Sequence, residues 1–202
     1  MGTRMARAVP AVVLLALLTG CASVEKNIVE LSPAFADHAP MTIVVLPVQN
    51  ETVDMDAPGV FRPIVEAAVP RRGYRLLDPR HVDDVVADQN IHDPGELAAM
   101  YTPKELGELF GADAVLYTVV TQWRTTYLFV YVVISVGARF ELFDAKTETL
   151  LWKWDETVND QRIAVDRDSA ARAAAFALRP YPPYVRRVVQ MAFSTLPERA
   201  WR

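Results

Sequence analysis

The period of the apolar positions changes along the chain and predicts a body of mixed helices and strands. Short β-branched runs and alternating runs predict strands at residues 42–46, 74–77, 114–121, 127–136, 139–143 and 150–157. Apolar side chains at helical spacing predict helices at residues 60–69, from 79 onward, and at 94–100, 103–110, 169–178 and 184–196. Helices and strands alternate early, and strands cluster late. This order favours a single α/β domain, three-layer-like, with a mixed β-sheet covered by helices.

Capping residues mark where several of the expected helices begin. Asp78-Pro79 and Asp93-Pro94 each place an N-cap side chain before a proline at the first helical position. Thr102-Pro103 repeats this arrangement, and Glu105 completes a capping box with Thr102. Gly111 is well placed to end that last helix.

The amino-terminal segment has the pattern of a secretory signal. Residues 1–7 carry two arginines and no acidic side chain, and residues 8–18 are apolar apart from one proline. This apolar run is too short to cross a bilayer as a permanent helix, which takes about 20 residues. It ends in Leu18-Thr19-Gly20-Cys21.

That ending resembles the lipobox of bacterial lipoproteins. The resemblance implies that a signal peptidase recognises Leu18, Thr19 and Gly20, cuts before Cys21, and leaves a diacylglycerol on the Cys21 thiol. Two or more acyl chains hold a protein stably on a membrane. Ala22-Ser23 follows, with no aspartate beside the cysteine, which by resemblance to enterobacterial sorting favours the outer membrane. The alternative is a soluble secreted protein with an incidental cysteine.

These segments predict three regions in the chain. Residues 1–20 are the expected lipoprotein signal peptide, residues 21–40 a lipidated tether, and residues 41–202 the α/β envelope domain. Cys21 is the only cysteine, so an intramolecular disulfide is excluded. The formal net charge of −4 offers no general attraction to nucleic acid, and we expect no nucleic-acid partner.

The polar residues do not form a recognisable catalytic or metal-binding pattern. His81, Asp84 and Asp88 lie at helical spacing, but His92 falls beyond the expected end of that helix. A solvated helix face is the better interpretation. The sequence also lacks a nucleophile elbow and a glycine-rich phosphate loop. We therefore expect no enzymatic activity, no metal and no cofactor apart from the lipid on Cys21.

The aromatic run at residues 127–134 is the candidate partner-binding segment. If the segment is one strand, alternation places Tyr127, Phe129 and Tyr131 on the same face. Tyrosine and phenylalanine are enriched at interface cores, so these rings, with Trp123, are candidate partner contacts. The alternative is a central strand covered by helices on both faces.

Three segments carry a wider resemblance: Ile43-Val44-Val45-Leu46-Pro47, residues 106–117, and Phe143-Asp144-Ala145-Lys146-Thr147 leading to Leu151-Trp152. They resemble the bacterial lipoprotein family known from a neisserial surface antigen. More distantly, they are similar to TolB amino-terminal, CsgG and LpoB-type envelope domains. The most specific motif is Gly111-Ala112-Asp113-Ala114, followed by Trp123. Relatives often carry Thr-Gly where this chain has Thr147-Glu148. The resemblance covers most of residues 41–196 and implies an envelope domain without known catalysis that acts beside CsgG-like lipoproteins.

These observations favour a noncatalytic assembly or accessory factor, anchored in the outer membrane and facing the periplasm. One alternative is a receptor for a small ligand or glycan, with Trp123, Trp152 and Trp154 as stacking residues. Another is an activator of a cell-wall synthesis enzyme, by resemblance to the LpoB-type domain alone. The sequence leaves open whether the chain forms a homo-oligomer.

Overall fold

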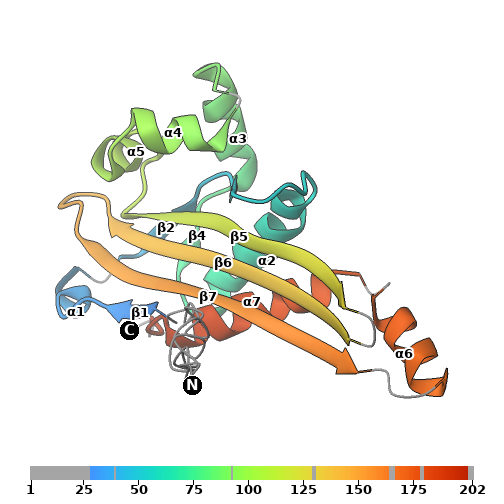
Figure 1. The fold of residues 1–202 in the computed structure, drawn as a ribbon. Helices are drawn as coiled ribbons and strands as arrows, with labels where there is room; N and C mark the ends of the chain where they lie inside the picture. Colours follow the sequence, from blue (N-terminus) through green and yellow to red (C-terminus); the bar gives the residue numbers. More distant parts are fainter. Residues whose placement is uncertain are drawn as a thin grey trace, which may run out of the picture.

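A computed structural model describes residues 28–38, 40–91, 93–128, 131–163, 167–177 and 180–199 (Figure 1). The expected signal peptide and the lipobox residues Leu18, Thr19, Gly20 and Cys21 lie outside these residues. No helix in the described part of the chain is both long and apolar enough to span a bilayer.

A seven-stranded mixed sheet organises the fold, in the order β1-β7-β6-β5-β2-β4, with β3 paired to β5. Strands β2 and β4 are parallel, as are β2 and β5, whereas β5, β6 and β7 form an antiparallel meander. The strands are β1 (Ile28–Leu31), β2 (Thr42–Val45), β3 (Gln49–Asn50), β4 (Arg75–Leu76), β5 (Ala114–Leu128), β6 (Tyr131–Asp144) and β7 (Leu150–Ile163). The predicted α/β class with a mixed sheet is confirmed.

Helices cover the two faces of this sheet unequally (Figure 1). One face packs against α2 and α7 along the main core, and the other packs against α3, α4 and α5 at one end only. The helices are α1 (Phe35–His38), α2 (Ala57–Arg71), α3 (Pro79–Asp88), α4 (Pro94–Met100), α5 (Pro103–Phe110), α6 (Arg167–Ala177) and α7 (Pro182–Thr195).

The predicted capping residues act as expected. The side chains of Asp78 and Asp93 each accept a hydrogen bond from a backbone N–H in the first helical turn, at 3.0 and 2.8 Å. Thr102 and Glu105 form both bonds of the capping box. Gly111 ends α5 in the left-handed conformation with φ of 68°. Asp113, two residues on, accepts from the backbone N–H of Thr42 at 2.9 Å and so joins the start of β5 to β2.

The core is built around the central ring of Phe140 in β6. Its centroid lies 6.2 Å from that of Trp152, 5.8 Å from Trp154 and 5.8 Å from Phe193 of α7. All four rings are buried. This cluster holds α7 on the meander, because two adjacent strands and the helix all contribute to it.

The structure corrects the prediction of one strand over residues 127–136. Strand β5 runs to Leu128, and β6 begins at Tyr131 in the opposite direction, with Leu128 paired to Tyr131. The chain therefore reverses inside the aromatic run. Alternation continued across the reversal, and none of the usual turn residues marks it, so the pattern alone concealed the hairpin.

The predicted start of the folded domain at Met41 is also wrong. Ile28–Leu31 pairs with residues 152–155 of β7, and Phe35 is buried in the main core. The assigned tether therefore contributes an edge strand and a short helix. An edge strand with half-exposed side chains has a weak pattern, which explains the error.

The β6–β7 turn forms where the sequence predicted it, and Asp144 organises it. The Asp144 carboxylate accepts from the backbone N–H groups of Lys146 and Thr147 at 3.0 and 2.8 Å and from the Thr147 hydroxyl at 2.9 Å. His38 Nδ1 lies 3.1 Å from the same carboxylate. Glu148, a non-glycine residue, takes the left-handed conformation in this turn, with φ of 59°.

Truncation of the central ring should be severely destabilising. We expect Phe140→Ala to lower the free energy of unfolding by about 3–5 kcal/mol, because it leaves a cavity among three aromatic neighbours. Urea unfolding of the unlipidated protein measures this. Tyr127→Ala, at an exposed position, is the control and should change stability by less than about 1 kcal/mol. Equal losses in both variants would contradict the central role of Phe140.

Asp144 should make stability depend on pH in the acid range. Burial acts to raise its pKa, but the hydrogen bonds from Thr147, Lys146 and His38 outweigh burial and hold the pKa of Asp144 below its ordinary value. The ionised Asp144 carboxylate therefore contributes fully to folding stability above its unfolded pKa of about 3.9. This contribution is lost as the pH falls through the lower folded pKa. We expect Asp144→Asn to cost about 1–3 kcal/mol at neutral pH. The difference from wild type in urea unfolding should shrink below about pH 4. A difference that is constant down to about pH 2.5 would contradict this assignment.

Candidate partner-binding surfaces

The residues with candidate chemistry do not converge. His81, Asp84 and Asp88 are exposed on α3, and His92 lies outside the described residues. In the part of the chain that the structure describes, no group of three or more His, Cys, Asp or Glu side chains could hold a metal ion. Three regions of the described surface carry apolar or ion-paired side chains that bear on partner binding.

The first surface is the far end of the meander, where β5, β6 and β7 extend past the body of the domain toward α6 (Figure 1). Tyr127 is 62% exposed, and Ile163, at the end of β7, is 58% exposed. Tyr131 is half-buried, and its hydroxyl donates to the side-chain oxygen of Gln161. We call this end of the sheet, which carries Tyr127 on one face and Tyr131 and Ile163 on the other, the distal surface.

The predicted aromatic face is divided by the hairpin. Tyr127 pairs with Val132 and Leu128 pairs with Tyr131, and cross-strand partners share a face. Tyr127 and Tyr131 therefore lie on opposite faces of the sheet. The prediction that these two rings share a face is wrong. Phe129 lies outside the described residues. Ile163, which the sequence analysis did not single out, pairs with Tyr131 and lies on its face.

Trp123 is a core residue. It is buried and stacks on Tyr181, with ring centroids 4.1 Å apart and planes 14° apart. The Tyr181 hydroxyl lies 3.0 Å from the Thr125 hydroxyl, which fixes the position of this ring. Trp123 thus joins β5 to the start of α7, and its ring is not presented to a partner.

The predicted receptor site built from three indole rings is also wrong, because all three rings are buried. Trp152 and Trp154 are fully buried under α7. The Trp152 indole N–H donates to the Thr195 hydroxyl at 2.9 Å, which satisfies its one polar group inside the protein. The alternation of Trp152 and Trp154 with Lys153 and Asp155 is the pattern of a strand with one buried face.

The second surface is the polar face of the meander. Arg139 binds Glu51 at 2.7 Å, and Lys153 binds Glu141 at 2.7 Å. Nearby, a notch of about 560 Å³ lies between this face and α4–α5, with Tyr117 and Phe143 among its lining residues. Burial raises the pKa of Tyr117 to about 12, and the charges of Glu141 and Glu148 add to the rise. The ion pairs partner the charged side chains on the part of this face that water reaches.

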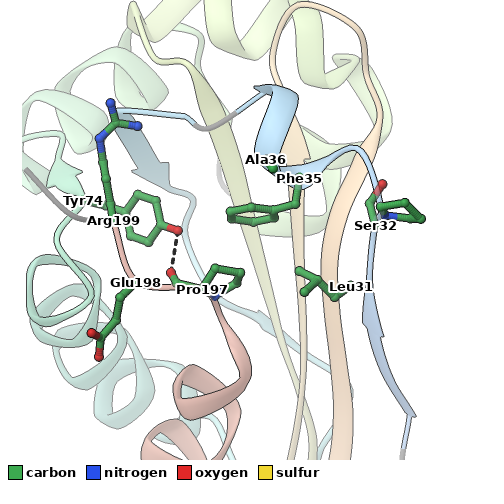
Figure 2. Close-up of a pocket in the computed structure, with 9 residues that line it drawn as sticks. Leu31, Ser32, Phe35, Ala36, Tyr74, Pro197, Glu198 and Arg199 are labelled. Carbon is green, nitrogen blue, oxygen red and sulfur yellow. Dashed lines mark hydrogen bonds between the residues drawn. The ribbon is translucent and has the colours of Figure 1, made fainter. Parts of the chain in front are cut away.

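The third surface is a groove between the amino-terminal strand and the segment after α7 (Figure 2). Its volume is about 460 Å³, and its walls come from Leu31, Phe35, Tyr74 and Pro197, with Arg199 at one end. The Tyr74 hydroxyl donates to the Pro197 carbonyl at 2.7 Å. Burial raises the pKa of Tyr74 to about 12, against the opposing effect of Arg72 and Arg199, so its hydroxyl remains a donor at neutral pH.

Sequence reasoning missed this groove because its parts are far apart in the chain. Leu31 and Phe35 fall in the segment assigned to the tether, and Pro197 follows the last predicted helix. The only available signal was the pair of apolar residues Val29 and Leu31, two positions apart before a serine-proline step.

Comparison with known proteins identifies the relatives of this fold. A family model described as "Putative lipoprotein GNA1162-like" matches residues 32–174. The "Putative lipoprotein NMB1124/NMB1162" of Neisseria meningitidis is 27% identical over 129 residues, which is 63% of this chain and 59% of that protein. The match therefore spans less than two thirds of the relative's length.

Solved structures agree at the level of the fold. Lipoprotein GNA1162 from Neisseria meningitidis superposes with a TM-score of 0.57 at 23% identity, covering 69% of this chain and 96% of that chain. PelC from Paraburkholderia phytofirmans, whose structure is a dodecamer, has a TM-score of 0.55 at 17% identity, covering 87% of this chain and 99% of that chain.

The expected resemblance to the neisserial lipoprotein family is confirmed. The descriptions of these relatives state no enzymatic activity. The likeness to TolB amino-terminal and CsgG domains stays a prediction. Because the family model matches more than half of the sequence, including all strands from β2 to β7, this chain belongs to the family described as "Putative lipoprotein GNA1162-like".

Proposed function

We propose that this protein is a noncatalytic accessory factor of a bacterial cell-envelope complex. It is held on the outer membrane by lipid on Cys21 and faces the periplasm. Membership of a lipoprotein family and the sequence Leu18-Thr19-Gly20-Cys21 support the anchor. Ala22-Ser23 follows Cys21, and the lack of an aspartate at these positions supports sorting to the outer membrane.

The observation that carries the partner-binding role is the position of the distal surface. Strand β1, through which the chain comes from Cys21, pairs with β7 at residues 152–155. Ile163 lies eight residues beyond Asp155 in β7, which at about 3.4 Å per residue is roughly 27 Å. The long strands therefore separate the exposed Tyr127 and Ile163 from the anchored edge, and large exposed apolar side chains at such an end suit a protein partner.

The proposed partners are other envelope proteins. A CsgG-like lipoprotein is the expected one, from the resemblance in the sequence. The similar fold of PelC, which forms a dodecamer, supports testing assemblies of this chain with itself. In the proposal, both a complex with a CsgG-like lipoprotein and a homo-oligomer use the exposed side chains of the distal surface.

The anchor is tested by replacing the lipidated residue. We expect Cys21→Ser to abolish acyl groups in the mature protein, measured by intact mass. The variant should also leave the washed membrane fraction, because stable anchoring takes two acyl chains. If intact mass shows no acyl group on the parent protein, and this protein still sediments with membranes, the lipoprotein assignment is wrong.

The distal surface is tested by a charged pair of substitutions. We expect Tyr127→Asp with Ile163→Asp to reduce recovery of crosslinked envelope partners at least about tenfold, since charges at an apolar contact cost more than about 1.4 kcal/mol. Met55→Asp, at an exposed loop position, is the matched control and should retain full recovery. All three proteins should melt alike. Normal recovery with the double variant would exclude this surface.

A further inference from the structure

The apolar face of the sheet extends one strand beyond its helical cover. Val29 pairs with Trp154 and Leu31 pairs with Trp152, so these side chains share one face. Both tryptophans are buried under α7, whereas Val29 and Leu31 are each 50% exposed. The core is therefore open at this edge.

The groove of Figure 2 continues this open edge. Leu31 belongs to both, and the rings of Phe35, Tyr74 and Pro197 also line the groove. The polar side chains that line the groove have bonds within the protein. Tyr74 donates to Pro197, and Arg199 Nη1 donates to the Pro40 carbonyl at 2.7 Å. Ser32 Oγ accepts from the Ala34 N–H at 3.2 Å, and the exposed Glu198 carboxylate pairs with Arg72 at 2.7 Å. An apolar lining with satisfied polar groups suits hydrocarbon better than a polar ligand. We call Val29, Leu31 and this groove the apolar edge.

The bilayer is the apolar phase within reach of the apolar edge. Cys21 precedes Ile28 by seven residues, and seven residues span at most about 25 Å when fully extended. A lipid on Cys21 thus holds β1 close to the membrane surface. Val29 and Leu31 lie at the start of the described chain, immediately after this connection.

From these contacts we propose that the apolar edge docks on the bilayer and inserts Val29 and Leu31 among lipid acyl chains, with the groove taking part of a chain. This rests on the proposed function for the anchor. Docking fixes which edge of the domain faces the membrane, with β1 against the lipid. The membrane is the one occupant proposed; a second copy of the chain would be a different result.

The first experiment uses the mature chain with Cys21→Ser, so that any binding comes from the protein surface alone. It is floated with vesicles of equimolar phosphatidylethanolamine and phosphatidylglycerol. Weak partition that rises with lipid concentration is expected. Val29→Asp with Leu31→Asp should reduce the partition coefficient about thirtyfold, because two half-buried aliphatic side chains are lost from the contact.

The matched control is Val53→Asp with Met55→Asp. These side chains are 98% and 85% exposed, in the loop before α2. The control variant should float like the parent, and thermal melting should show that all three proteins are folded. No binding by the parent, or equal loss in both variants, would overturn the proposal.

A second measurement does not depend on charged substitutions. Because Cys21 is the only cysteine, Leu31→Cys in the Cys21→Ser background accepts a single environment-sensitive fluorophore. Its emission should shift to the blue when vesicles are added, and the same label at Met55→Cys should not respond. A shift at position 31 that appears on raising protein concentration without vesicles would show that a second copy covers the edge, against the proposal.

The two hypotheses can fail separately. If the parent does not bind vesicles but Cys21 is acylated and partners are recovered through the distal surface, only docking is wrong. If Cys21 carries no acyl group in the native host, the anchor is wrong whatever the vesicles show.

Discussion

The fold depends on burying one face of a three-stranded meander whose strands are longer than the helices that cover them. Phe140, Trp152, Trp154 and Phe193 provide the centre of that cover, because their rings join β6 and β7 to α7. Helix α7 has 14 residues and rises about 1.5 Å for each, whereas the 14 residues of β7 rise about 3.4 Å each. A helix of equal residue count therefore covers less than half of the strand. Exposed apolar side chains at the distal end of the sheet are consistent with this mismatch.

The sequence predicted best the features that local chemistry decides. Asp78, Asp93 and the Thr102 capping box fix helix starts through bonds within one turn, so their pattern is sufficient. The turn at Asp144 is similarly local, since its carboxylate accepts from Lys146 and Thr147, two and three residues on. The fold class followed because the order of elements leaves few ways to pair the strands.

The errors occurred where a nonlocal contact decides the structure. Nothing local distinguishes Ile28–Leu31 from a tether, because its pairing partner lies more than a hundred residues away in β7. The reversal between Leu128 and Tyr131 is set by the register of β5 on β6. The indole rings were open to two interpretations for the same reason: Trp152 is a core residue only because α7 returns to cover it. Candidate sites assigned from alternation alone therefore required the fold before they could be judged.

The uneven cover of the sheet also goes with a difference in composition between its two faces. On the polar face, Arg139 and Lys153 pair with Glu51 and Glu141, and such half-exposed pairs are stable in water without further cover. At the β1 edge of the α7 face, Val29 and Leu31 are half-exposed, and water is a poor solvent for both side chains. A protein built this way tolerates solvent on the polar face but gains from an apolar neighbour at the edge of the other. If Cys21 carries the proposed lipid, the membrane meets that edge first, and the far ends of the long strands remain for the proposed protein partners.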